Sequence, residues 1–301
     1  VERGGRVFPE SDKATDVRNA FIDTYRKLGG QLHLEETVKG LIVKDGAITG
    51  VITDKGTYEC DAAIIATGGM SYPLTGSTGD GYELASSVGH SIVELRPSLI
   101  PLETKEHWVK DLMGLSLKNV EVSIIAKNKV QTKQFGEMLF AHFGVTGPII
   151  LSASHTVTKL LKKKVDPITI EINLKPALTK EVLDKRVQRD FSESQNKQLV
   201  NVLKGLLPSK LIPVICQLAE LEGTKAIHDI TKEERLRLVD AIQHMRLTVH
   251  KPRPIAEAIV TAGGISVKEV DPKTMQSKLV HGLYMAGEVL DVDAFTGGYN
   301  L

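Results

Sequence analysis

Short apolar runs that end in glycine turns constrain the fold of this chain more than any other feature. The run Ala62 to Ala66 leads into Thr67-Gly68-Gly69, and the run Leu283 to Met285 leads into Ala286-Gly287-Glu288. Glycines let backbone amides approach a bulky ligand that side chains would keep away. In an open α/β sheet, turns that follow strands lie at the carboxyl edge, where ligands bind. The pattern predicts an α/β domain with a ligand site at one edge of its sheet.

The segment before the first glycine turn is expected to form a helix and then a β-meander. Apolar residues recur at helical spacing over Lys13 to Leu28, and Gly29-Gly30 ends the helix. The predicted apolar stripe consists of Ala14, Val17, Ala20, Phe21 and Tyr25. Three strand-like runs follow at Gln31 to Leu34, Val38 to Val43 and Ala47 to Thr53. Between the last two runs, Lys44-Asp45-Gly46 predicts a hairpin.

The strand Ala62 to Ala66 is expected to be fully buried and to share a sheet with the strand that ends at Met285. A loop from Ser71 to Gly79 precedes a predicted helix over Asp80 to Val88.

From about residue 106 to about residue 253, longer strands and charged helices replace the glycine-punctuated short strands. Leu117 to Ala126 and Lys129 to Phe135 predict a hairpin through Lys127-Asn128. A helix over Pro148 to Leu161, a strand over Ile168 to Leu174 and helices over 179–203, 208–221 and 232–244 are expected to follow. We therefore expect one α/β domain in two parts, 1–105 and 254–301, interrupted by a mixed β-barrel-like and helical insertion at 106–253.

Overall composition excludes several classes of protein. The formal net charge is +1, so no global charge favours nucleic acid or an acidic membrane. The one notable charge run, Lys162-Lys163-Lys164, is expected to be a solvated helix end. Cys60 and Cys216 lie far apart without a CxxC, which argues against a disulfide framework or a zinc ribbon. No ligand spacing indicates a metal, no apolar stretch is long enough to span a bilayer, and the cytoplasm is the expected location.

Three glycine-bearing turns follow or flank strands, at 66–69, 76–81 and 287–300. One such turn alone is more simply explained as a strand end or a helix cap. Three together favour a nucleotide-type ligand. No GxGxxG follows a strand, however, so no local motif identifies a dinucleotide pyrophosphate site.

Five motifs occur in order along the chain: Gly5-Arg6-Val7-Phe8-Pro9, the segment Ala66 to Pro73, the segment Thr75 to Gly81, the segment Phe140 to Pro148, and Gly282 to Asp291 with Thr296 to Leu301. Together they resemble the NAD(P)/FAD-dependent oxidoreductase family of aminoacetone-oxidase-like and bile-acid-reductase-like bacterial flavoproteins. More distantly, ATGG, GDG and GLYxAGE look like the fumarate reductase flavoprotein superfamily. The resemblance covers essentially the whole chain. It implies an FAD/NAD(P)-binding, Rossmann-like fold that uses FAD, with NAD(P)H as an electron donor.

Members of this family begin with a strand and a GxGxxG turn upstream of the equivalent of Gly5, and they continue with a helix beyond the equivalent of Leu301. Here residue 1 is Val rather than Met. We therefore expect an excised or incomplete chain. Because the helix-terminus site for the FAD pyrophosphate is not among these residues, we expect the chain alone to bind FAD weakly or not at all.

The resemblance also implies roles for particular residues. Thr67, Gly68 and Gly69 would approach FAD near its adenosine half, and Gly287 and Glu288 would lie beside its ribityl or pyrophosphate region. The residues expected to face the isoalloxazine ring are Gly297, Gly298, Asn300 and Leu301. Amides at a helix start favour the negative charge that a reduced flavin gathers.

No catalytic base is obvious, but two residues are candidates. His142, in a Phe- and Gly-rich turn, would protonate a substrate, because imidazole titrates near neutral pH. The alternative is a hydrogen-bonded structural histidine. Tyr72 would donate a hydrogen bond to a substrate carbonyl, or would only pack against Pro73. Arg6 would clamp an acidic group, or would cap a pair of carboxylates in a structural role.

We expect a flavoprotein that transfers a hydride through flavin N5 between a nicotinamide and a small organic substrate, as in the reduction of a conjugated C=C bond. Amine oxidation and reduction of uridine in ribosomal RNA are alternatives within the family. A non-catalytic remnant, or a binding scaffold without a cofactor site, is the alternative from another class. The near-neutral charge disfavours a nucleic-acid partner, no membrane partner is expected, and the oligomeric state stays open.

Overall fold

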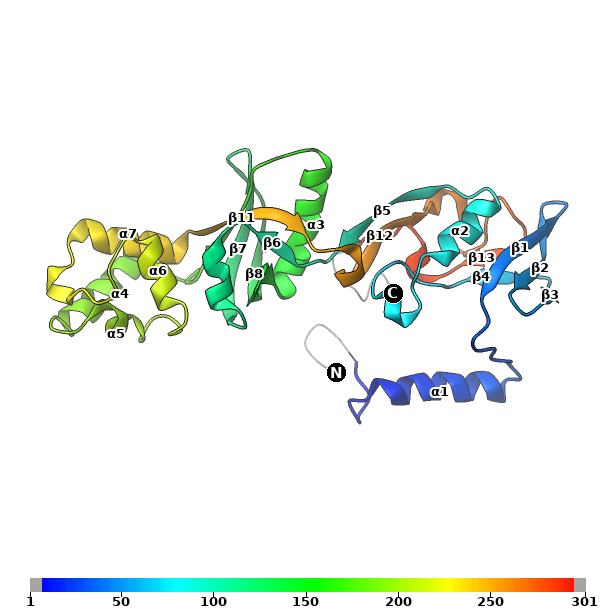
Figure 1. Cartoon of the computed structure of the whole chain (residues 1–301), viewed down its shortest axis with the longest axis horizontal. Coiled ribbons are helices and arrows are strands. Elements are labelled where there is room, and N and C mark those ends of the chain that lie inside the picture. Colours follow the sequence, from blue (N-terminus) through cyan, green and yellow to red (C-terminus); the bar gives the residue numbers. More distant parts are fainter. Residues whose placement is uncertain (1–6, 295–301) are drawn as a thin grey trace.

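The computed structural model describes residues 7–294, which form an elongated molecule of three parts (Figure 1). A group of helices lies at one end, a β-barrel in the middle, and the strands that carry the glycine turns at the other end. Within these residues, no helix has the length and apolarity that a bilayer crossing requires.

The meander contains two of the three predicted strands and a third strand that was not predicted. It consists of β1 (Val38–Lys44), β2 (Ala47–Thr53) and β3 (Thr57–Glu59), paired antiparallel in that order. Asp45 and Gly46 take φ values of 50° and 77°, as the central residues of a tight hairpin turn do. The strand predicted over Gln31 to Leu34 is wrong. That segment is irregular because no strand among the described residues lies beside it to share backbone hydrogen bonds.

Helix α1 (Ala14–Lys27) forms where the apolar spacing predicted it, but its apolar face is not covered. Val17, Phe21 and Tyr25 are 42%, 74% and 50% exposed. The helix has no buried residue and stands apart from the strands in Figure 1. The apolar spacing therefore predicts the helix correctly. Within the described residues, however, the apolar face of this helix packs against no other element.

Two strands from opposite ends of the sequence form the sheet that carries the glycine turns. β4 (Ala63–Ile65) and β13 (Leu283–Met285) are parallel neighbours, which confirms the prediction that they share a sheet. The expectation of full burial is wrong, because Ile65 is 4% exposed whereas Ile64 is 67% exposed. Successive side chains point to opposite faces of a strand, and described residues cover only the face that carries Ile65.

A second strand pair connects this sheet to the barrel. Helix α2 (Asp80–Ser87) follows the first glycine turns and leads to β5 (Ile92–Ser98). β5 pairs antiparallel with β12 (Val260–Ile265), which follows the last barrel strand. Figure 1 shows these two strands side by side between the barrel and the glycine-turn region.

The middle part is a closed barrel in the order β10-β11-β6-β9-β8-β7. The predicted hairpin is confirmed: β7 (Ser116–Ala126) and β8 (Lys129–Ala141) join through Lys127 and Asn128, whose φ values are 52° and 57°. The helix α3 (Pro148–Lys162) and the strand β10 (Ile168–Asn173) were also predicted. The barrel closes through three further strands that the sequence did not predict, namely β6 (Leu102–Thr104), β9 (Gly144–Thr146) and β11 (Met245–Pro252).

The far end is built from α4 (Lys180–Ser192), α5 (Leu199–Leu203), α6 (Ile212–Leu218) and α7 (Lys232–Gln243). Thr231 starts α7 with a reciprocal cap, because its Oγ1 accepts the N–H of Glu234 while Glu234 Oε2 accepts the N–H of Thr231. Short 3₁₀ turns connect the larger elements: η1 (Pro73–Thr75), η2 (His107–Leu112), η3 (Ile227–Asp229), η4 (Ile255–Glu257), η5 (Val267–Glu269) and η6 (Gly287–Val289).

Residues 7–294 form two separate apolar cores. One runs from the barrel into the terminal helices, and the other surrounds β4, β13 and α2. The first barrel strand, β6, begins at Leu102, ahead of the boundary expected at residue 106. The boundaries at 106 and 253 stay predictions.

Candidate functional site

The turns that follow β4 and β13 leave the sheet at the same edge. The N–H of Ala286 donates to the carbonyl oxygen of Ile65 at 2.9 Å, so the two strands stay paired up to the point where both turn. Thr67-Gly68-Gly69 leave β4 there, and Gly287-Glu288 leave β13 in η6. The structure thus brings together the two sets of described residues for which the sequence predicted cofactor contacts.

Thr261 on β12 joins these two turns. Its Oγ1 accepts the N–H of Met70 at 2.8 Å and lies 3.1 Å from Oγ of Ser71. The N–H of Thr261 donates to Oε1 of Glu288 at 2.7 Å. The residue is 1% exposed. Sequence reasoning missed Thr261, and the only signal for it was a threonine in an apolar run next to a glycine pair, Gly263-Gly264.

Gly69 and Gly287 meet different requirements. A Cβ on Gly69 would clash with Oγ1 of Thr261 and lie 2.8 Å from Oε1 of Glu288, so the protein's own packing demands glycine there. Gly287 has a φ of +80°, and a Cβ on it would meet no atom of residues 7–294 within 4 Å. Backbone in this conformation that faces open space is accessible to a bound ligand. Gly287 is therefore the better candidate for direct contact with a cofactor.

The second glycine turn packs on the first. A Cβ on Gly68 would lie 2.7 Å from Oγ of Ser77, and a Cβ on Gly81 would clash with Oγ1 of Thr67. The first turn of α2 therefore lies directly against Thr67. Asp80, the first residue of α2, accepts a hydrogen bond from Oγ1 of Thr78 at 2.7 Å.

Tyr82 on α2 places a buried hydroxyl near this edge. No atom of residues 7–294 hydrogen bonds to its Oη. Burial, and then the charge of Glu288, raises the pKa of Tyr82 to about 12, so the hydroxyl is a neutral donor near pH 7. Buried polar groups in native proteins nearly always have a partner. An unpartnered donor here fits a site that a bound polar group completes.

The two candidate catalytic residues both lie near η4. Tyr72 has a φ of 49°, is 49% exposed, and donates its N–H to the carbonyl oxygen of Ala256 at 3.2 Å. His142 is exposed, and its ring lies edge-on to Phe143 at 5.0 Å between centroids. The hydrogen bond from Arg253 lowers the pKa of Glu257, with a smaller contribution from His142. Tyr72 and His142 thus border the same short turn.

Arg253 fixes that turn to the barrel. Its Nε and one terminal nitrogen donate to the two carboxylate oxygens of Glu257 at 2.9 and 2.6 Å, and the other terminal nitrogen donates to Glu103 on β6 at 2.9 Å. These carboxylates raise the pKa of Arg253, and the guanidinium lies 4.6 Å from the centre of the Phe143 ring. Such a paired, planar cation holds its neighbours in one geometry.

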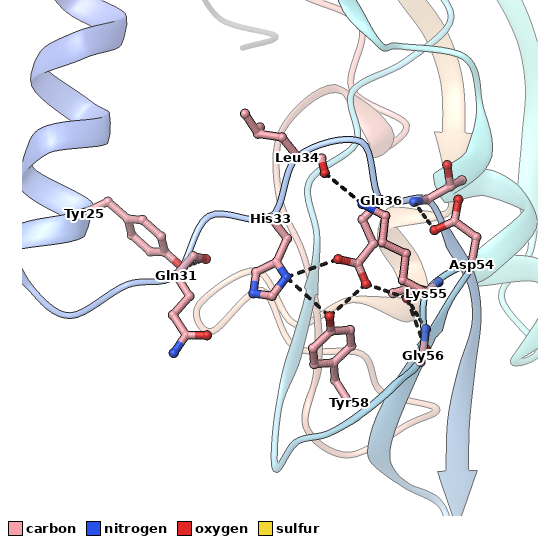
Figure 2. A network of polar contacts seen from close by, with 11 residues as sticks. Tyr25, Gln31, His33, Leu34, Glu36, Asp54, Lys55, Gly56 and Tyr58 are labelled. Carbon is pink, nitrogen blue, oxygen red and sulfur yellow. Dashed lines mark hydrogen bonds and ion pairs between the residues drawn. The ribbon is translucent and has the colours of Figure 1, made fainter.

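A cavity of about 510 Å³ lies between the meander and β4, lined by residues that include Val38, Tyr58, Ile64 and Thr67. Figure 2 shows the polar network beside it, in which the Glu36 carboxylate accepts hydrogen bonds from Thr53 Oγ1 at 2.6 Å and from Tyr58 Oη at 2.8 Å. These bonds lower the pKa of Glu36, and the Glu36 carboxylate raises the pKa of Tyr58. Thr67 belongs both to the cavity lining and to the turn that follows β4. The cavity therefore adjoins the edge formed by the glycine turns.

Five of the predicted functional residues lie outside the residues that the structure describes. They are Arg6, Gly297, Gly298, Asn300 and Leu301. Within residues 7–294, no group of three or more His, Cys, Asp or Glu side chains is arranged to hold a metal ion.

A parallel strand pair with glycine turns at one edge, interrupted in sequence by a barrel, is the arrangement of a Rossmann-like ligand-binding domain. The chain belongs to the family described as HI0933-like protein Rossmann domain, which matches residues 1–301. The fold class and the family predicted from the sequence are thereby confirmed.

Two named proteins and one solved structure are similar to this chain. The chain is 27% identical over 307 residues to the 3-dehydro-bile acid delta(4,6)-reductase of Clostridium scindens, covering 99% of this chain and 72% of that protein. It is 30% identical over 279 residues to the ribosomal RNA dihydrouridine synthase of Haemophilus influenzae, covering 91% of this chain and 66% of that protein. Among solved structures, it resembles the quinol fumarate reductase of E. coli at 15% identity and a TM-score of 0.38, covering 93% of this chain and 43% of that one.

Proposed function

We propose that this protein is an FAD-dependent oxidoreductase that transfers a hydride between a nicotinamide and an organic substrate with a conjugated C=C bond. The observation that carries the proposal is the common edge of β4 and β13, where Thr67-Gly68-Gly69 and Gly287-Glu288 meet. Membership of a flavoprotein family and the reductase among the relatives support it. We also propose that the protein works in the cytoplasm.

The residues at this edge fit FAD. Gly287 offers accessible backbone, Tyr82 offers a buried donor without a described partner, and the cavity beside Thr67 offers room for the far half of an extended ligand. FAD would supply the hydride chemistry at its N5 atom. The proposed contacts are Thr67, Gly68, Gly69, Gly287 and Glu288, and the absence of a side chain at Gly69 also lets Thr261 and Glu288 pack. The predicted contacts at Gly297, Gly298, Asn300 and Leu301 stay part of the proposal.

The residues around η4 would handle the substrate. We propose that the exposed imidazole of His142 delivers a proton to the substrate carbon, and that the hydroxyl of Tyr72 donates a hydrogen bond to the substrate carbonyl. Arg253 would not touch the substrate. Its bonds to Glu103 and Glu257 would hold η4 in place, and with it the separation between Tyr72 and His142. In this proposal residues 106–253 form the roof of the substrate pocket.

Spectroscopy of the purified protein at its natural length tests this function. We expect a visible flavin absorption band that bleaches when NADH or NADPH is added without oxygen, and that returns when an enone substrate follows. A protein that stays colourless after addition of FAD would overturn the proposal and favour a non-catalytic binding scaffold. The expectation that these 301 residues alone bind FAD weakly stays a prediction, and fluorescence titration with FAD measures it.

A second candidate is reduction of uridine in ribosomal RNA. The observation that favours it is the relative of 30% identity over 91% of this chain, which is named a ribosomal RNA dihydrouridine synthase. Mass spectrometry of ribosomal RNA from cells with and without the gene separates the two candidates. Loss of a dihydrouridine would favour RNA, and unchanged RNA would leave the small substrate. Amine oxidation stays an alternative that an assay for peroxide formation tests.

A further inference from the structure

A buried polar cluster connects three distant parts of the chain. Asp293 lies a few residues after Glu288, and its side chain is 12% exposed. Its Oδ1 accepts a hydrogen bond from Oγ of Ser98 on β5 at 2.8 Å, and its Oδ2 lies 3.1 Å from Nδ1 of His155 on α3. Ser98 and His155 are themselves buried. One carboxylate therefore joins the segment that follows Glu288 to the connecting strand β5 and to the helix α3.

Arg96 completes the cluster with a positive charge. Arg96 and Ser98 alternate along β5, so their side chains leave the same face of the strand. A terminal nitrogen of Arg96 lies 3.4 Å from Oδ2 of Asp293. A carboxylate that is removed from water is stable only when paired charges and hydrogen bonds replace its hydration. Here β5 and α3 supply those groups together, so the cluster favours one arrangement of the two elements and of the segment that carries Asp293.

Helix α3 transmits this arrangement to the barrel. The residue before its start, Gly147, packs tightly on β8, because a Cβ on Gly147 would lie 2.9 Å from Cα of Met138. Ile150 and Val157 of α3 lie in the apolar core of the barrel. His142, the proposed proton donor, lies in the turn between β8 and β9 and so belongs to the same packed body. The position of α3 therefore sets where His142 lies relative to the glycine turns.

Two chain segments connect the barrel to the glycine-turn region, since β5 leads into β6 and β11 leads through η4 into β12 (Figure 1). Beside them, Oγ of Ser154 on α3 accepts the N–H of Ile100 at 2.9 Å. Lys162 on α3 pairs with Glu94 on β5 at 2.7 Å, but both side chains are largely exposed, and such pairs contribute little. Parts of a chain with separate apolar cores move relative to each other by default. The buried link at Asp293 limits that motion.

We propose that Asp293 is a positioning residue that, together with His155, holds the barrel at a fixed separation from the cofactor edge. The catalytic part of this inference rests on the proposed function, in which His142 delivers a proton to a substrate beside the flavin. Asp293 acts through His155 and α3 and takes no part in proton or hydride transfer. Without its carboxylate, the barrel pivots on the two connecting segments, and His142 loses the fixed position that fast proton transfer requires.

The distance between two spin labels tests this link independently of the flavin. The labels are attached at two exposed positions, Ser86→Cys on α2 and Lys129→Cys on β8, of the protein at its natural length. Cys60→Ser and Cys216→Ala first remove the two native thiols. Pulsed electron spin resonance should then give one narrow distance distribution between the glycine-turn region and the barrel.

Variants of the cluster should change this distribution in a specific pattern. Asp293→Ala and His155→Ala should each broaden it, and the double variant should be no broader than either, because both changes remove one link. Asp293→Asn should keep it narrow, since its amide oxygen accepts from Ser98 and its amide nitrogen donates to Nδ1 of His155. Glu94→Ala is the matched control, because it removes the exposed ion pair between the same two elements and should leave the distribution unchanged.

Circular dichroism establishes that each variant is folded. An unchanged distribution in Asp293→Ala or in His155→Ala would overturn the proposal. Additive broadening in the double variant would also overturn it, because it would show that the two residues act separately.

Kinetics of the flavin-loaded protein test the consequence for turnover. Asp293→Ala should lower kcat by about tenfold or more, because a shift of about 1 Å between reacting groups can cost about 100-fold. The flavin content and the KM for the enone should stay close to those of the wild type, and Asp293→Asn should restore most of the turnover. Wild-type kcat in a variant with a broadened distribution would overturn the positioning role. A protein that binds no FAD would overturn the proposed function instead, and the spin-label distances would still decide whether Asp293 holds the barrel.

Discussion

Glu288 and Thr261 are joined by a hydrogen bond of 2.7 Å from the N–H of Thr261 to Oε1 of Glu288. Thr261 lies on β12, and Glu288 follows the end of β13. The bond therefore connects the turn after β13 to the backbone of β12. Because Oγ1 of Thr261 also accepts the N–H of Met70, the pair connects both glycine turns of the candidate site. The geometry of the proposed cofactor edge therefore depends on a residue that need not contact the cofactor.

Removal of the Glu288 carboxylate should destabilise this edge. Glu288→Ala leaves the N–H of the buried Thr261 without an acceptor, which typically costs about 1–3 kcal/mol. Glu288→Gln keeps an acceptor oxygen and is the matched control. Urea unfolding of both variants measures the difference. Equal stability of Glu288→Ala and the wild type would show that the bond contributes nothing.

Alanine at the two glycines should separate packing from ligand contact. Gly69→Ala should lower stability, because the added Cβ clashes with Oγ1 of Thr261. In Gly287→Ala the added Cβ meets no described atom within 4 Å, so the variant should cost only about 1 kcal/mol for its left-handed backbone, yet it should weaken FAD binding more than its stability loss explains. Thermal melts and FAD titration of both variants test this. Unchanged FAD affinity in Gly287→Ala would remove Gly287 from the cofactor site.

His142 is expected to act in turnover and not in cofactor binding. His142→Ala should lower kcat by about 100-fold or more, as loss of a general acid does, while the flavin content stays that of the wild type. His142→Gln preserves polarity and should be as slow as alanine, because glutamine cannot deliver a proton. Steady-state kinetics and the flavin absorption measure the two effects. Wild-type turnover with a lower melting temperature would assign His142 a structural role.

Local turn chemistry explains which parts of the fold were predictable. The hairpins at Asp45-Gly46 and Lys127-Asn128 depend on residues that accept positive φ, so each could be recognised within a few residues. The three-residue strands β6 and β9 could not be recognised from their own residues. Each is defined by hydrogen bonds to the barrel strands on both of its sides. The segment Gln31 to Leu34 shows the reverse case, a strand-like sequence without a neighbour to pair with.

The candidate site was predictable only in part for a similar reason. Glycines after apolar runs revealed the edge formed by Thr67-Gly68-Gly69 and Gly287-Glu288. The role of Thr261 depends on β12 reaching both turns, and nothing in its own neighbourhood encodes that contact. Likewise, the clamp made by Arg253 with Glu103 depends on the chain entering and leaving the barrel at adjacent strands.

A buried histidine outside the candidate site gives the stability of this protein a pH dependence. The side chain of His90 is fully buried, and it lies 2.8 Å from Oγ of Ser277 through Nε2 and 3.2 Å from Glu269 through Nδ1. Oγ of Ser277 already accepts the N–H groups of Leu279 and Val280. Its own proton must therefore point to Nε2, which leaves the histidine proton on Nδ1, donated to Glu269.

Acid should unfold the protein partly by charging His90. Burial lowers the pKa of His90, against the smaller opposing effect of Glu269. A histidine whose pKa is lower in the folded state than in the unfolded state contributes its full stability at pH values above the unfolded-state pKa of about 6.5. That stability is lost as the pH falls below the unfolded-state pKa. Urea unfolding between pH 7.5 and about 5.5 should therefore show that the free energy of unfolding declines as the pH falls.

His90→Gln should be less stable at pH 7.5 but should flatten this decline, whereas replacement of the exposed His281 by Gln should leave the decline unchanged. A decline of the same slope in His90→Gln would show that another group carries the pH dependence.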